Sequence, residues 1–287
     1  MATALAGTTS TARRTRNTVA MVCVWASVLV AAVPLLFVVV YLVQKGAKVV
    51  NLDFLTKDIP VSSRLRGPGM GPAVLGTLLT TAAATAMAVP LGVLAAVYLN
   101  EYGRRGRLPG TVRFLADVMT GVPSIVMGLF IYTVWVLRFG YSAFAGALAL
   151  GCLMLPIVIR SAETALQLVS NELREASAAL GARTSRTILT VVLPAALPGV
   201  LSGALLAVAR AAGETAPLLF TMGTTKSPNP HLFSGTNTAL SVQIFQNARE
   251  PYEGAIQRAW GAALTLIVLV FVLTAVARLI ARRFTVR

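Results

Sequence analysis

Long apolar runs, separated by short polar and basic stretches, make up most of this chain. Six of them approach or exceed the length of a transmembrane helix, which is about 20 predominantly apolar residues. These runs cover residues 19–43, 71–99, 114–137, 143–159, 188–212 and 256–280. The pattern therefore predicts an all-α membrane protein with six transmembrane helices.

Two of the runs carry features that modify a simple helix. The run over 143–159 is short where it meets Arg160, although it could continue beyond that residue. The run over 188–212 contains Pro194 and Pro198, and each should kink the helix because proline cannot donate the backbone hydrogen bond of its turn. In the same run, Gly199 and Gly203 form a small-residue face of the kind that lets membrane helices pack closely.

The run over 19–43 follows a basic stretch and must be distinguished from a cleaved signal peptide. The apolar region of a signal peptide has about 7–15 residues, and this run is much longer. No small-residue cleavage motif follows it directly. We expect the run to remain in the protein as its first transmembrane helix.

The polar segments divide the chain into further parts. Residues 1–18 are rich in Thr, Ala and Arg, a composition that favours disorder. Residues 223–254 are rich in Pro, Asn, Ser, Thr and Gly, and should form a loop with a short helix near 239–247. The expected divisions are an N-terminal tail (1–18), a first helix (19–43), a loop on the outer side (44–70), a main membrane domain (71–280) and a C-terminal tail (281–287).

The composition agrees with a membrane location. Hydrophobic residues make up 56% of the chain and charged residues 12%, whereas a soluble domain carries about 25% charged residues. The net charge is +15, but the basic residues gather at the ends of apolar runs, which is typical of membrane topology. No nucleic-acid motif accompanies them, so we expect contact with membrane lipid and none with nucleic acid.

The distribution of Lys and Arg predicts the orientation. If the N-terminus lies inside, the inner segments hold the majority of the 25 Lys and Arg residues. Because cytoplasmic segments carry an excess of these residues, both termini should lie in the cytoplasm. The inner segments are then 1–18, the loop near 100–113, the stretch near 160–186 and the C-terminal end.

Residues suited to catalysis or metal binding are scarce. Cys23 and Cys152 both fall within apolar runs, where cysteine serves as a small apolar side chain. His231 is the only histidine, and one histidine cannot build a metal site. We therefore expect no catalytic residue, no metal site and no enzyme activity in this chain.

Arg210 and Glu214 stand out because they lie in an otherwise apolar stretch. An arginine at the centre of a membrane helix costs about 2.5–3.5 kcal/mol on insertion scales. Four residues apart, the two side chains can meet on one helix face. They either form a structural ion pair or line a polar path, since intramembrane charges usually face a cavity. Gly213 and Pro217 favour the path because both loosen the helix there.

The same pair suggests a substrate. A guanidinium binds tetrahedral oxyanions through two parallel hydrogen bonds. Glu214 could hold Arg210 at rest, or it could accept a hydrogen bond from a protonated phosphate oxygen, which fully deprotonated sulfate lacks. Phosphate is therefore favoured over sulfate. Arg160 is a second candidate ligand, with snorkelling to the membrane interface as the alternative.

A short charged segment connects the fourth and fifth runs. It contains Glu175-Ala176-Ser177 and Gly181, and Leu193-Pro194 follows downstream. This spacing resembles the EAA loop of ABC importer permeases, with Ser177 in place of the second Ala. The resemblance implies that a coupling helix at about 171–186 docks into an ATPase subunit. The alternative is an ordinary cytoplasmic helix that stops at a glycine.

Two longer stretches resemble PstA-type permeases of bacterial phosphate ABC importers. They are Gly121-Val-Pro-Ser-Ile-Val-Met-Gly128 and Ala209-Arg-Ala-Ala-Gly-Glu-Thr-Ala-Pro217. The resemblance runs from about residue 71 to residue 280, and it implies the type I, MetI-like permease fold in a bacterial plasma membrane. Ser124 and Thr215, which lie within these motifs, join the candidate substrate path with Arg160, Arg210 and Glu214.

The same resemblance implies a complex. Its members would be a homologous PstC-type permease, two PstB-type ATPase subunits and an extracytoplasmic PstS-type phosphate-binding protein. This chain has no nucleotide-binding glycine loop of its own. ATP and Mg²⁺ should therefore bind to the partner ATPases, and this chain should hold no cofactor.

Other functions fit parts of the pattern. A sulfate or molybdate permease would share the fold and the arginine, and a membrane scaffold for phosphate signalling would share the partners. An ion-driven secondary transporter fits less well, because the charged docking segment has no role in it and no internal repeat is evident.

Overall fold

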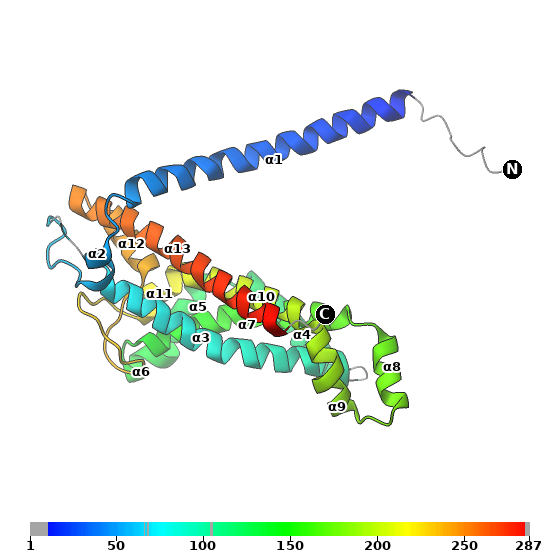
Figure 1. Cartoon of the computed structure of the whole chain (residues 1–287). Coiled ribbons are helices and arrows are strands. Elements are labelled where there is room, and N and C mark those ends of the chain that lie inside the picture. The colour runs from blue at the N-terminus through cyan, green and yellow to red at the C-terminus, as the bar shows by residue number, and fades with distance from the viewer. Residues whose placement is uncertain (1–10, 66, 68, 104–105, 285–287) are drawn as a thin grey trace.

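The computed structural model describes residues 11–65, 67, 69–103 and 106–284. All regular structure in these residues is helical (Figure 1). Within them, five helices are long and apolar enough to cross a membrane. The five segments are Ala12–Gly46, Gly71–Tyr102, Ala143–Gln167, Thr184–Gly213 and Glu253–Leu279. They correspond to five of the six predicted runs, and the all-α membrane fold is confirmed.

The first helix stands apart from the others. Helix α1 (Thr11–Gly46) projects away from the bundle and approaches it only near its C-terminal end (Figure 1). There the ring of Tyr41 meets that of Trp260 edge-on, with centroids 5.1 Å apart, and Leu42 is buried. The predicted disordered tail is too long, since residues 11–18 belong to α1. Residues 1–10 lie outside the described part of the chain.

The predicted third transmembrane helix over 114–137 is not a single helix but a bent pair, Arg107–Gly121 and Ser124–Phe139, which together are long and apolar enough to cross a membrane. Helix α4 (Arg107–Gly121) and the segment that begins with α5 (Ser124–Ile131) meet at an angle of 105°. Val122 and Pro123 between them are extended, with ψ of 125° and 134°. A residue before proline is disfavoured in helical conformation, and proline lacks the N–H of a continuing helix. The segment after the break continues through η2 (Tyr132–Val136) and α6 (Leu137–Phe139).

Small residues form the centre of the bundle. Helices α3 (Gly71–Val97), α7 (Ala143–Gln167) and α10 (Leu193–Gly213) pack against one another there. Side chains that are at most 2% exposed line these contacts, among them Ala84, Ala88, Ala147, Ala207 and Ala211. A Cβ on Gly203 would lie 2.1 Å from the Ser161 hydroxyl oxygen. Close approach of this kind is what a small-residue face provides.

Gly76 of α3 offers a test of this packing. A Cβ there would lie 1.9 Å from the carbonyl oxygen of Thr238, and backbone on both sides limits relaxation. We expect Gly76→Ala to destabilise the protein by about 1–3 kcal/mol, the usual cost of overpacking. Gly110→Ala is the matched control, because nothing lies within 4 Å of a Cβ there. Thermal unfolding of both variants in detergent should separate them, and equal midpoints would contradict the packing.

The chain between α7 and α10 forms the end of the molecule that lies opposite α2 (Leu52–Thr56) and α12 (Leu240–Ala248) (Figure 1). It consists of α8 (Asn171–Ala179), α9 (Thr184–Thr187) and the π-helical turn η3 (Ile188–Val192). The helix expected over 171–186 is therefore shorter, because Gly181 has a positive φ of 77° and ends it. The helix predicted near 239–247 is confirmed as α12.

The last two helices complete the bundle. Helix α11 (Ala216–Thr221) follows α10 after a two-residue break. Helix α13 (Glu253–Phe284) packs against α1, α10 and α12. Since α13 extends to residue 284, the expected C-terminal tail over 281–287 begins later, and residues 285–287 lie outside the described part.

Candidate functional site

Arg210 and Glu214 lie where the fifth apolar run breaks. Helix α10 ends at Gly213, and Glu214 is extended, with φ −69° and ψ 133°. Pro217 stands in the first turn of α11, where its missing N–H costs nothing. The Nε of Arg210 lies 3.7 Å from a carboxylate oxygen of Glu214. The predicted pair therefore forms, but across the end of a helix rather than along a continuous one.

The Arg210 side chain is open to its surroundings. It is 68% exposed, whereas the Glu214 side chain is 20% exposed. The Glu214 backbone is fixed, because its carbonyl accepts a hydrogen bond of 2.8 Å from the Ser241 hydroxyl. A distance of 3.7 Å is too long for a hydrogen bond. Arg210 thus lies within ion-pair distance of Glu214, is not buried between helices, and borders a space that Glu214 also lines.

That space is a cavity of about 190 Å³. Its walls come from the end of α4, the break before α5, the middle of α7 and the end of α10. The lining residues include Met119, Thr120, Pro123, Ser124, Met154, Ile157, Arg210 and Glu214. The structure thus brings together Arg210, Glu214 and Ser124. Thr215, another predicted residue of the substrate path, does not line the cavity. Its carbonyl accepts hydrogen bonds from the first turn of α11.

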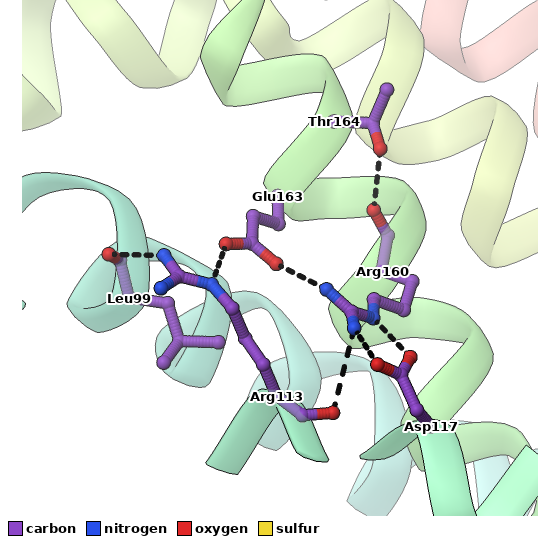
Figure 2. Close-up of polar contacts among 6 residues, drawn as sticks. All are labelled: Leu99, Arg113, Asp117, Arg160, Glu163 and Thr164. Carbon is purple, nitrogen blue, oxygen red and sulfur yellow. Dashed lines mark hydrogen bonds and ion pairs between the residues drawn. The ribbon is translucent and has the colours of Figure 1, made fainter. Parts of the chain in front are cut away.

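Arg160 lies in a separate charged cluster between α4 and α7, which Figure 2 shows. Its Nε donates to Asp117 over 2.8 Å, its Nη2 meets the other oxygen of Asp117, and its Nη1 lies 3.3 Å from Glu163. Glu163 also accepts from Nε of Arg113 over 2.6 Å, and Nη2 of Arg113 donates to the Leu99 carbonyl over 3.0 Å. Arg160 is therefore held by carboxylates.

Sequence reasoning missed Arg113, Asp117 and Glu163. The available signal was their spacing: Arg113 and Asp117 are four residues apart, and Arg160 and Glu163 are three apart. Such spacings place both members on one helix face. The sequence could not show that α4 packs on α7. This packing joins the pair on α4 and the pair on α7 into one charged cluster.

The coupling-type segment is anchored at its first turn. Arg174 of α8 forms a two-bond ion pair with Glu101 of η1 (Tyr98–Tyr102), at 2.8 and 3.3 Å. Both side chains are largely buried, at 14% and 6% exposure. Nη1 and Nη2 of Arg174 also donate to the carbonyls of Val169 and Leu166. Helix α8 is therefore fastened to the end of α3 rather than free in a loop.

The rest of the segment presents a surface. Glu175 and Ala176 are exposed, and Leu180 is 90% exposed. Ser177 is half-buried, and its hydroxyl lies 2.8 Å from that of Thr187. Gly181 follows in the left-handed conformation. In this chain the outward face of α8 and the leucine that follows it are therefore not covered by other helices.

Residues 88–286 match the family model described as "Binding-protein-dependent transport system inner membrane component". The chain is 42% identical over 272 residues to the "Phosphate transport system permease protein PstA 1" of Mycobacterium tuberculosis (strain CDC 1551 / Oshkosh), covering 93% of this chain and 89% of the relative. It is 39% identical over 269 residues to the corresponding PstA of Yersinia pestis, with coverage of 93% and 90%.

A solved structure has a similar fold. It is an inward-facing conformation of the MetNI methionine ABC transporter, with a TM-score of 0.60 and 20% sequence identity. The similarity covers 75% of this chain and 94% of that chain. At this identity the likeness concerns the fold, which is the MetI-like permease fold.

Proposed function

The chain belongs to the family of binding-protein-dependent transport system inner membrane components, among its PstA-type permeases, and from this premise we propose that it is the permease subunit of an ATP-driven importer of inorganic phosphate. The observation that carries the proposal is the cavity beside Arg210, Glu214 and Ser124. It places a guanidinium, a carboxylate and a hydroxyl around one small space at a break between apolar helices.

The three groups suit a protonated phosphate. The guanidinium of Arg210 supplies parallel donors for two oxyanion oxygens. The carboxylate of Glu214 accepts a hydrogen bond from the remaining P–OH, and the hydroxyl of Ser124 can donate or accept. Fully deprotonated sulfate has no O–H to offer and would meet Glu214 with like charge. The site therefore favours phosphate over sulfate, and molybdate would suffer the same repulsion when fully deprotonated.

The transport path requires partners. A homologous PstC-type permease would cover the open side of the Arg210 cavity, and a PstS-type binding protein would deliver phosphate at the outer end. Both termini would be cytoplasmic, in a multi-pass protein of the bacterial plasma membrane with lipid around its apolar helices. Arg210 would then be exposed to the outer and inner sides in turn.

The energy would come from two PstB-type ATPase subunits, which bind ATP and Mg²⁺. The exposed surface around Glu175 and Ala176 is the proposed contact, with Ser177 and Gly181 shaping the segment. Arg174 carries motion of α8 to the end of α3 through Glu101. Coupling by this route requires that the helical bundle has two conformations, and that the ATPase contact at α8 and the Arg210 cavity both shift the equilibrium between them.

Uptake of labelled phosphate tests the proposed function. In an importer-deletion strain that expresses the whole complex, we expect phosphate uptake that excess sulfate does not reduce. Uptake should stop when ATP is depleted while the proton gradient is maintained. Sulfate uptake in place of phosphate uptake, or phosphate uptake without ATP, would contradict the proposal.

Glu214→Gln tests the basis of selectivity. The amide removes the negative charge and can donate a hydrogen bond to sulfate, so the preference for phosphate over sulfate should fall by about tenfold or more, as expected for loss of one hydrogen bond to a charged group. Asp53→Asn removes a carboxylate of α2 that does not line the cavity and is the control. An unchanged preference, measured by competition in the uptake assay, would remove Glu214 from substrate recognition.

A further inference from the structure

Arg160 is held by two carboxylates that differ sharply in exposure. The side chain of Asp117 is 58% exposed and that of Glu163 is 4% exposed. Asp117 nevertheless makes the closer contact, through Nε and Nη2 of the guanidinium. Of the two ion pairs that Arg160 makes, the one with two contacts is thus the one whose carboxylate is the more exposed.

Glu163 is the fixed partner. One of its oxygens accepts from Arg113 over 2.6 Å and the other faces Nη1 of Arg160 at 3.3 Å. Moving a buried carboxylate away from two arginines would leave uncompensated charges, which is strongly unfavourable. Arg160 therefore keeps its position and orientation even without Asp117.

Asp117 is the replaceable partner. Exposed ion pairs contribute little to stability, because water screens them and solvates the separated charges. The two nitrogens that Asp117 occupies form one edge of the guanidinium, and the same edge binds phosphate with two parallel bonds. When the Asp117 side chain turns toward solvent, this edge becomes an oxyanion site held in place from behind by Glu163.

The Arg160 cluster adjoins the Arg210 cavity. Thr120 and Ile157 line both that cavity and an open groove of about 460 Å³ that contains Arg160. Arg160 follows Ile157 by about one helical turn along α7, toward the end of the molecule that carries α8 (Figure 1). An anion that leaves the Arg210 cavity toward α8 meets Arg160 next.

We infer that Arg160 is a second binding site for the transported tetrahedral oxyanion, and that the Asp117 carboxylate occupies this site when no substrate is bound. The inference rests on the proposed function, since it assumes that phosphate reaches this groove. Substrate displaces Asp117 from the guanidinium, and one of the two ion-paired links between α4 and α7 opens. On departure of phosphate, Asp117 returns and prevents the anion from rebinding.

Equilibrium binding of labelled inorganic phosphate tests the inference. The assay uses the purified complex of this chain with its partner permease and ATPases, without ATP, in an Arg210→Gln background that removes the first site. Asp117→Asn should strengthen the residual phosphate binding by about twofold to fivefold, the ratio that corresponds to loss of a competing exposed ion pair. Adding Arg160→Gln should abolish that gain.

Two controls separate the inference from simpler effects. Asp53→Asn removes a carboxylate of matched exposure, 56%, from the ion pair of α2 with Lys57, and should leave binding unchanged. Asp117→Ser replaces Asp117→Asn if the amide variant does not assemble. Weaker or unchanged phosphate binding in the Asp117 variants, or a gain that survives Arg160→Gln, would overturn the inference. The proposed function would stand in either case, because it is decided by uptake through the intact Arg210 site.

Discussion

Arg210→Gln is expected to reduce phosphate uptake by about a hundredfold or more while the complex still assembles. The glutamine removes the positive charge and the paired donors, and each hydrogen bond to a charged group contributes about 1.5–3 kcal/mol. Because the Arg210 side chain is 68% exposed and borders a cavity, its loss should leave the packing of α10 intact. Uptake of labelled phosphate, normalised to the amount of purified complex, measures the effect.

Two further variants sharpen this prediction. Arg210→Lys keeps the charge but loses the planar pair of donors, so uptake should fall less than in the glutamine variant. Arg138→Gln makes the same charge change in α6, where the guanidinium stacks on Phe139 at 5.4 Å, and should transport normally. Normal uptake by Arg210→Gln would show that the arginine is a structural charge and not a ligand.

Gly181→Val is expected to uncouple ATP hydrolysis from uptake. Gly181 has a φ of 77°, a conformation that costs a β-branched residue about 1–3 kcal/mol. The turn that it closes includes a hydrogen bond of 3.2 Å from Ala182 N–H to the Ser177 carbonyl. Straining this turn should shift α8 and lower phosphate uptake by about tenfold, with ATP hydrolysis no longer stimulated by loaded binding protein.

Gly181→Asn is the matched control for the coupling prediction. Asparagine tolerates the left-handed conformation, so this variant should retain coupled transport. Glu175→Lys reverses a charge on the exposed surface of α8, at the proposed ATPase contact. It should also uncouple ATP hydrolysis from phosphate uptake. If valine and asparagine behave alike, the geometry of this turn is not part of the coupling.

The sequence revealed most of the spans because apolar length is a local property. Residues of α1, α3, α7, α10 and α13 form continuous apolar runs, and each run became a helix. The third run was not predicted correctly, because its helix breaks at Val122 and Pro123. The proline was visible, but an apolar run gives no sign of whether the chain bends by a few degrees or by 105°. The direction after the break is set by packing against α7 and α11.

In the candidate site, too, local features could be predicted from the sequence, whereas features that depend on helix packing could not. Arg210 and Glu214 could be found because two charges in one apolar stretch are a local anomaly, and their spacing predicted the pair. Glu163 lies three residues after Arg160 on α7, so their pairing is local. Arg113 and Asp117 come from α4, and their contacts with Glu163 and Arg160 exist only once α4 lies on α7. Thr215 illustrates the converse, because it belongs to the motif but does not line the cavity beside Arg210.

Protection of an introduced thiol tests the central claim, that phosphate passes through the Arg210 cavity. Ser124→Cys places the thiol on the cavity wall, in a chain whose own Cys23 and Cys152 have been replaced by alanine. In the assembled complex, phosphate should slow alkylation of this thiol by a small water-soluble reagent, and sulfate at the same concentration should not. Equal alkylation rates with and without phosphate would contradict the account.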